Sequence, residues 1–185
     1  IGASGKVHSF EPDKANFGKL QANISANKLV SLIQANNIAL SDVDGLLSFT
    51  TGLDKENHIA NENGPDTVQI PAQKLDTYIR RNGISKIAYL KIDVEGFEYF
   101  VLKGAQHLLS QNLVQIIQIE INDTMKNSNS TIDALLMILS QYSYNLCRYD
   151  VEANQLKPVR YSGTMENYFA VSDLREANEE LLEAF

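Results

Sequence analysis

Residues 87–98 have the sequence Ile87-Ala88-Tyr89-Leu90-Lys91-Ile92-Asp93-Val94-Glu95-Gly96-Phe97-Glu98, and the expected fold depends on them. The first half is apolar, β-branched and aromatic and far too short to cross a membrane, so it predicts a central parallel strand with both faces buried. The segment then turns polar at Asp93 and Glu95. Because ligands of open α/β sheets bind beyond the carboxyl ends of the strands, these carboxylates are candidates for chemistry. The alternative is that they are solvated turn residues or helix caps, since acidic residues are common at helix N-termini.

Helical patterns and a second strand surround this segment. Residues 97–112 place apolar side chains at helical spacing and predict one helix, and Leu75–Gly83 predicts a shorter helix with a glycine stop. Leu113–Ile121 predicts a second buried strand with a polar end. The polar residues at that end are Glu120, Asn122 and Asp123. The alternation of strands and helices is typical of an α/β fold.

Glu11 occupies a comparable position near the start of the chain. Val7–Phe10 predicts a short strand, and Pro12 and Asp13 suit the first turn of a helix that follows. In nucleotide-binding α/β folds, a carboxylate at the end of the second strand accepts hydrogen bonds from both ribose hydroxyls. Glu11 is therefore a candidate ribose ligand.

The next part of the chain is less regular. Val30–Leu40 predicts an interrupted strand region, and Leu46–Thr50 predicts its antiparallel hairpin partner. Residues 54–67 are the most polar segment and predict a mobile loop, which either binds ligands or is a solvated excursion. His58 within this loop is a candidate base or an exposed histidine.

The last third of the chain predicts a helix, two strands and a final helix. Ser130 resembles a helix cap before an apolar helical face. Tyr144–Tyr149 and Tyr168–Val171 predict closing strands, and residues 172–185 predict the C-terminal helix. We expect a single domain over residues 1–185, with an antiparallel finish to its sheet.

The composition narrows the class of protein. The 185 residues carry a net charge of −7 and a pI near 4.9, which argues against a nucleic-acid partner because affinity for phosphate backbones comes mostly from Lys and Arg. No apolar run approaches the roughly 20 residues that span a bilayer, and no secretory leader opens the chain, so we expect a cytoplasmic protein without a membrane partner. Cys147 is the single cysteine and is expected to be buried and inert.

Several short motifs together resemble the FkbM family of S-adenosylmethionine-dependent methyltransferases, from residue 5 to about residue 171. In chain order they are Gly5-Lys6-Val7 leading to Phe10-Glu11-Pro12, then Leu20 and Asn23, Asn37-Ile38-Ala39-Leu40-Ser41-Asp42 with Gly45, Leu75-Asp76, Leu90-Lys91-Ile92-Asp93-Val94-Glu95-Gly96 with Glu98, Val101-Leu102-Lys103-Gly104-Ala105, and Glu120. The resemblance implies a Rossmann-like class I methyltransferase fold with a mostly parallel sheet and an antiparallel final strand. It also implies O-methylation, usually of hydroxyls on sugars or secondary metabolites.

The resemblance assigns site residues as well. It implies S-adenosylmethionine as the cofactor, held by Phe10, Glu11, Pro12, Asn37, Ala39 and Asp93. Family members have a first strand, a glycine-rich loop and a helix before the segment that matches residue 5 onward. Glu11 follows Gly5 by only six residues, which leaves no room for that helix. We therefore expect an N-terminally incomplete piece of a longer protein, which alone binds the cofactor poorly.

The chemistry of methyl transfer points to the same carboxylates. The acceptor oxygen must lie in line with the methyl group and lose a proton, so a base is needed. Asp93 is the leading candidate, with Glu95 and Glu120 behind it.

A competing hypothesis is a Mg²⁺ site formed by Asp93, Asn122 and Asp123, because hard cations prefer oxygen ligands. Another alternative is a non-catalytic binding or scaffolding module of the same fold. The acceptor is expected to be a small molecule or carbohydrate, and the sequence predicts no oligomeric state.

Overall fold

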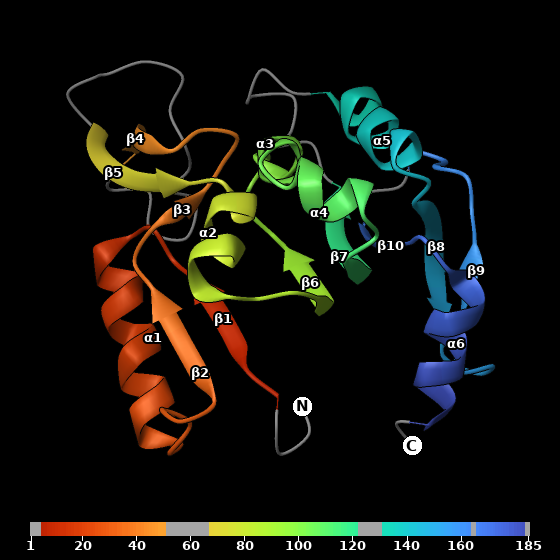
Figure 1. The fold of residues 1–185 in the computed structure, drawn as a ribbon, viewed down its shortest axis with the longest axis horizontal. Coiled ribbons are helices and arrows are strands. Elements are labelled where there is room, and N and C mark those ends of the chain that lie inside the picture. The colour runs from red at the N-terminus through yellow and green to blue at the C-terminus, as the bar shows by residue number, and fades with distance from the viewer. Residues whose placement is uncertain (1–4, 51–66, 122–130, 164–165, 184–185) are drawn as a thin grey trace.

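The structure is a computed structural model that describes residues 5–50, 67–121, 131–163 and 166–183 (Figure 1). It is an α/β fold with three sheets. The largest sheet has five strands in the order β6-β7-β10-β8-β9, and Figure 1 shows it running from the middle of the molecule to the right. Its strands are β6 (Ile87–Ile92), β7 (Val114–Ile121), β8 (Asn145–Asp150), β9 (Gln155–Pro158) and β10 (Glu166–Val171).

The five-stranded sheet is mixed. β6 and β7 pair in parallel, whereas the pairs β7–β10, β10–β8 and β8–β9 are all antiparallel. The prediction of a mostly parallel sheet is therefore wrong for this sheet, and the antiparallel finish is confirmed. β9 was not predicted, because its four residues, Gln155 to Pro158, form no apolar or alternating pattern.

β6 lies at the edge of the sheet and pairs only with β7 in the part of the chain that the structure describes. Ile92 is buried in the main core, but Lys91 is exposed and Tyr89 is 49% exposed. The prediction of a central strand with both faces buried is therefore wrong for the described residues. Ala88 on the opposite face is exposed as well, so both faces are partly open, as the edge position of β6 explains.

A smaller unit precedes this sheet. β1 (Val7–Phe10) and β2 (Ile33–Asn36) pair in parallel and are connected through α1 (Lys14–Ala26). Asp13 caps this helix, because its Oδ1 accepts the N–H of Asn16 at 2.8 Å. The predicted strand and helix in this part of the chain are confirmed.

The third sheet has the order β3-β5-β4 and consists of β3 (Ala39–Leu40), β4 (Gly45–Thr50) and β5 (Thr67–Gln73). β4 pairs antiparallel with β5, and β3 pairs parallel with β5. The predicted hairpin between β4 and the preceding strand is therefore wrong. Of the loop predicted at 54–67, Thr67 belongs to β5, and the rest, including His58, lies outside the described residues.

Three short helices follow: α2 (Leu75–Asn82), α3 (Glu98–Lys103) and α4 (Gln106–Ser110). α2 was predicted and is confirmed. The prediction of one helix over residues 97–112 is wrong, because α3 ends at Lys103 and α4 begins at Gln106. The apolar spacing continues across this break, which explains why the pattern suggested a single helix.

A carboxylate from α2 marks the start of α4. Asp76 Oδ2 accepts the N–H of His107 at 2.8 Å, and its Oδ1 accepts the N–H of Leu108 at 3.1 Å. The first N–H groups of a helix have no partner within the helix, so a cap brought from elsewhere in the fold stabilises a separate helix start.

α5 (Ile132–Gln141) and α6 (Leu174–Glu183) pack on opposite faces of the five-stranded sheet. Thr131 caps α5 by accepting the N–H of Ala134 at 3.1 Å, while the predicted cap Ser130 lies outside the described residues. The main core lies between the sheet and α2 to α5, and a smaller core lies beneath α6. Among the described residues, no helix is both long enough and apolar enough to span a membrane.

Candidate functional site

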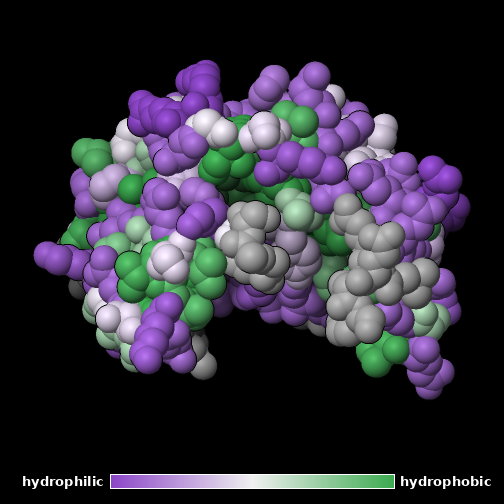
Figure 2. Space-filling view, turned by 60° about the horizontal axis from the view of Figure 1, so that its bottom comes forward, coloured by the Kyte–Doolittle hydropathy of each residue, from purple (hydrophilic) through white to green (hydrophobic). Residues whose placement is uncertain are grey.

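A cleft of about 1000 Å³ lies between β1 and β6. Its lining includes the residues that follow both strands, Glu11 after β1 and Asp93 and Glu95 after β6, together with Tyr78 of α2. The face shown in Figure 2 is visibly hollowed, with polar side chains around the hollow and apolar side chains deeper in it. The volume lies at the upper end of the range for small-molecule sites, which is roughly 300–1,000 Å³.

Glu11 is fixed where β1 ends. Its backbone N–H donates to the carbonyl oxygen of Asn36 at 3.0 Å, and its Oε1 accepts the N–H of Asp13 at 2.8 Å. Partial burial raises the pKa of the Glu11 carboxyl, and the bond from Asp13 acts in the opposite direction. The second carboxyl oxygen leaves capacity for further hydrogen bonds, so the position suits a ligand with vicinal hydroxyls.

The other predicted cofactor residues divide into two groups. Phe10, Pro12 and Ala39 line the cleft with Glu11. Asn37 instead supports the loop, because its Nδ2 donates to the carbonyl oxygens of Glu11 at 2.8 Å and Pro12 at 3.0 Å. The structure therefore places Asn37 as a brace for the Glu11 loop.

Asp93 lies between an ammonium group and a second carboxyl group. Lys91 Nζ donates to Asp93 Oδ2 at 2.6 Å, and Asp93 also shares a hydrogen bond with Glu120 near the end of β7. The Lys91 bond is the main cause that lowers the pKa of Asp93, the Glu120 bond lowers it further, and burial opposes both. The structure therefore brings Asp93 and Glu120, two of the three predicted catalytic residues, next to each other.

Glu95, the third predicted catalytic residue, lies in an unusual turn. Its φ is +49°, and that of Gly96 is +95°. Glu98 holds this turn, because its Oε1 accepts the N–H groups of Val94 at 3.1 Å and Gly96 at 3.3 Å. Glu98 was not predicted as a site residue, although a glutamate two residues after Gly96 at the end of an acidic turn is a local signal for such a contact.

A cluster of polar side chains around the Tyr78 hydroxyl, on the wall of the cleft, was not predicted. The Tyr78 hydroxyl lies 2.8 Å from His8 Nδ1, 3.1 Å from Gln34 Nε2 and 3.1 Å from Asn36 Oδ1. Burial lowers the pKa of His8. The cluster ties the β1–β2 unit to α2, and its members come from three separate elements, so no local sequence pattern reveals it.

The proposed Mg²⁺ ligands are only partly placed. Asp93 lies at the site, but Asn122 and Asp123 fall outside the described residues. Within the described ranges, no group of three or more His, Cys, Asp or Glu side chains is arranged to hold a metal ion. The site residues that are described therefore do not fit a metal centre by themselves.

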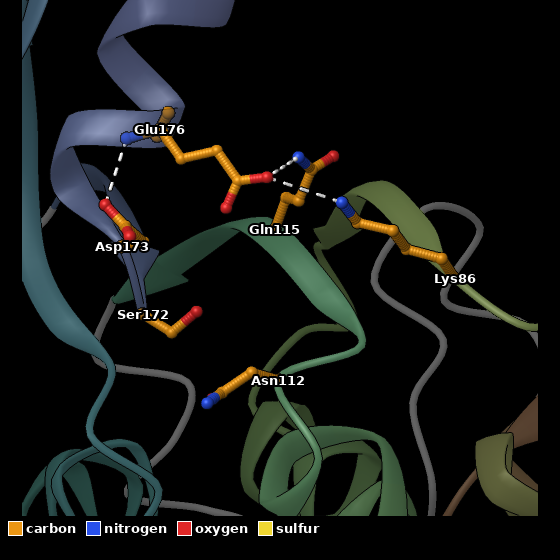
Figure 3. Close-up of a pocket in the computed structure, with 7 residues that line it drawn as sticks. Lys86, Asn112, Gln115, Ser172, Asp173 and Glu176 are labelled. Carbon is orange, nitrogen blue, oxygen red and sulfur yellow. Dashed lines mark hydrogen bonds and ion pairs between the residues drawn. The ribbon is translucent and has the colours of Figure 1, made fainter.

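A smaller pocket of about 300 Å³ lies where β6 and β7 begin, away from the acidic turn (Figure 3). Lys86 Nζ lies 3.5 Å from Glu176 Oε1, which also accepts a bond from Gln115 Nε2 at 3.1 Å. Asp173 caps α6 by accepting the N–H of Glu176 at 3.0 Å. These contacts satisfy one another, as Figure 3 shows, and dock α6 on the sheet.

Comparison with known proteins identifies the family of the chain. A family model described as the methyltransferase FkbM domain matches residues 1–146. The chain belongs to the FkbM methyltransferase family, which confirms the prediction from the sequence motifs. No curated protein matches the chain.

A solved structure shows a similar fold. The crystal structure of the methyltransferase FkbM from Methylobacillus flagellatus KT superimposes with a TM-score of 0.50 at 20% sequence identity. The match covers 90% of this chain and 36% of that chain, so the present chain spans about a third of the length of that protein. At this identity the likeness supports the α/β fold with mixed sheets and no more.

Proposed function

We propose that this chain belongs to an S-adenosylmethionine-dependent methyltransferase that O-methylates a hydroxyl of a sugar or another small metabolite. One observation carries the proposal: Glu11 and Asp93 follow the carboxyl ends of β1 and β6 and line the same cleft. Ligands of α/β sheets bind at such strand ends. The parallel pairs β1–β2 and β6–β7, each connected through helices, support a Rossmann-like class I fold.

Glu11 is the proposed ribose ligand. The N–H of Asp13 holds its carboxyl group and the carbonyl oxygen of Asn36 holds its backbone N–H, so its position is set before a ligand arrives. Two vicinal hydroxyls can donate to one carboxylate, and a charged acceptor makes such bonds stronger than neutral ones.

Asp93 is proposed to act on the acceptor. When bound, S-adenosylmethionine supplies an electrophilic methyl group on a sulfonium. The lowered pKa of Asp93 makes it a weak base, so its first role is to accept a hydrogen bond from the acceptor hydroxyl and orient one oxygen lone pair. The hydroxyl becomes more acidic as its oxygen bonds to carbon, and its proton then passes to the ionised carboxylate of Asp93.

The test is a methyl-transfer assay with radiolabelled S-adenosylmethionine on a panel of sugars and hydroxylated metabolites. We expect label in the organic product with at least one acceptor, and loss of that transfer in Asp93→Asn. A chain that binds S-adenosylhomocysteine but never transfers a methyl group would instead support the non-catalytic binding module.

A further inference from the structure

Glu98 is a buried carboxylic acid whose hydrogen bonding is one-sided. It is the first residue of α3 and is 0% exposed. Its Oε1 accepts the N–H groups of Val94 and Gly96, at 3.1 Å and 3.3 Å. Its other oxygen, Oε2, is buried and has no hydrogen-bond partner in the part of the chain that the structure describes. A buried oxygen without a hydrogen bond destabilises the fold, so we expect Glu98 to stabilise another feature of the structure.

The feature that Glu98 stabilises is the backbone of the acidic turn, residues 94–96. Glu95 has a φ of +49°, a left-handed conformation that costs a side-chain-bearing residue roughly 1–2 kcal/mol. Gly96 also has a positive φ, and the turn brings the N–H groups of Val94 and Gly96 to one point, as in the backbone concavities that bind anionic oxygens. Here the carboxyl of Glu98 fills that concavity from within the protein.

We propose that Glu98 is a positioning residue for the site: through Oε1 it fixes the backbone of residues 94–96 and thereby sets where Asp93 and Glu95 stand at the cleft. Glu98 does not line the cleft itself, whereas Asp93, Val94 and Glu95 do. It therefore acts from behind the turn. Its role in methyl transfer rests on the proposed function, but its hold on the turn does not.

The protonation of Glu98 follows from its surroundings. Burial is the main cause that raises its pKa, and the negative charge of Asp93 raises it further, while bonds from backbone N–H groups, including those of Val94 and Gly96, lower it. A proton on the unpartnered Oε2 leaves Oε1 free to accept both N–H groups. The amide signals of Val94 and Gly96 should therefore titrate with Glu98.

The experiment is amide hydrogen exchange and a pH titration by NMR on the whole chain. Glu98→Ala should speed exchange at Val94 and Gly96 by about tenfold or more, because it removes the shared acceptor. Glu98→Gln keeps an Oε1 acceptor and should largely retain protection, while the part of the amide pH titration that is due to Glu98 should vanish and that due to Asp93 should remain. Glu95→Gln, on the same turn, is the control and should keep both the exchange protection and the pH titration of the two amides.

Unchanged exchange at Val94 and Gly96 in Glu98→Ala would overturn the proposal. If that variant fails to fold, Glu98→Gln decides, and exchange at the two amides as fast in it as in unprotected backbone would overturn the proposal as well. In an active enzyme, Glu98→Ala should lower kcat far more than it weakens cofactor binding, because the proposed ribose ligand Glu11 belongs to the β1–β2 unit. Glu98→Gln should recover much of kcat. Absence of methyl transfer by the wild type would contradict the proposed function and leave the exchange result as the test of the turn.

Discussion

A Cβ atom at Gly104 would lie 1.9 Å from the carbonyl oxygen of Ser41. The end of α3 therefore packs directly, backbone against backbone, on the turn that follows β3. The same glycine accepts the N–H of Asp76 through its carbonyl oxygen at 3.0 Å. This junction joins the three-stranded sheet to the helices that cover the main core, and it requires a residue without a side chain.

Replacing Gly104 by alanine should therefore destabilise the protein strongly. The contact is to backbone rather than to the flexible end of a side chain, so relief requires moving a whole turn. We expect the free energy of unfolding to fall by about 3 kcal/mol or more, measured by urea denaturation. Gly18→Ala in α1 is the matched control, because nothing lies within 4 Å of its Cβ position, and it should stabilise by roughly 0.5–1 kcal/mol. Equal effects of the two variants would contradict the packing described here.

The cap that Asp76 supplies to α4 gives a second prediction. Asp76→Ala leaves the N–H groups of His107 and Leu108 without their acceptor, so stability should fall by about 1–2 kcal/mol. Asp133→Ala, in the first turn of α5, should cost only about 0.3–1 kcal/mol, because there the carboxylate acts through the helix dipole. Urea denaturation of both variants checks this, and a smaller loss for Asp76→Ala would contradict it.

Burial of Cys147 controls its reactivity. Burial raises the pKa of its thiol to about 11, so at pH 8 only about one thousandth is thiolate. A colorimetric thiol reagent should react slowly with the folded protein and rapidly after unfolding, and the single cysteine makes the reading unambiguous. Because the folded pKa is raised, the stability from the neutral thiol is lost as the pH rises from about 9 to 11, and Cys147→Ala should remove that loss. Equal thiol reactivity in the folded and unfolded states would contradict the burial.

Features that depend on neighbouring residues were predictable from the sequence. Glu11 and Asp93 directly follow apolar strand sequences, so their place at strand ends needed only local patterns. By contrast, the partners of Tyr78 and Asp76 lie tens of residues away along the chain. Their contacts come from tertiary packing, which no periodicity encodes.

Two errors in the predicted fold have the same origin. β4 was paired with the strand before it because nearby strands usually form hairpins, but its partner β5 follows after residues 51–66. The break between α3 and α4 was missed because the cap at Asp76 and the contact at Ser41 both come from other elements. Local apolar spacing predicted the helical segments correctly and their separation incorrectly.

The ion pair of Lys91 with Asp93 predicts a pH dependence of methyl transfer. Lys91 holds the pKa of Asp93 below its ordinary value, so Asp93 stays ionised as the pH falls through the usual carboxyl range. Asp93→Asn should lower kcat by roughly 10²–10⁴-fold. Lys91→Gln should raise the pKa of Asp93 and move the acid limb of the pH–rate profile upward. An acid limb that stays in place would contradict the assigned cause.

The same assay tests the Mg²⁺ alternative. If the carboxylates act without a metal, activity should be unchanged by EDTA. Loss of activity with EDTA and its return with Mg²⁺ would assign Asp93 as a metal ligand, together with Asn122 or Asp123.

The most direct test of the proposed site is calorimetric titration of S-adenosylhomocysteine into the natural full-length protein and into Glu11→Ala and Asp93→Asn. Loss of the charged ribose acceptor should weaken binding by roughly 1.5–3 kcal/mol in Glu11→Ala, whereas Asp93→Asn should bind almost as the wild type does. That separation is expected if the two ends of the cleft serve cofactor and acceptor. Unchanged affinity in Glu11→Ala, or no binding by the wild type, would contradict the account.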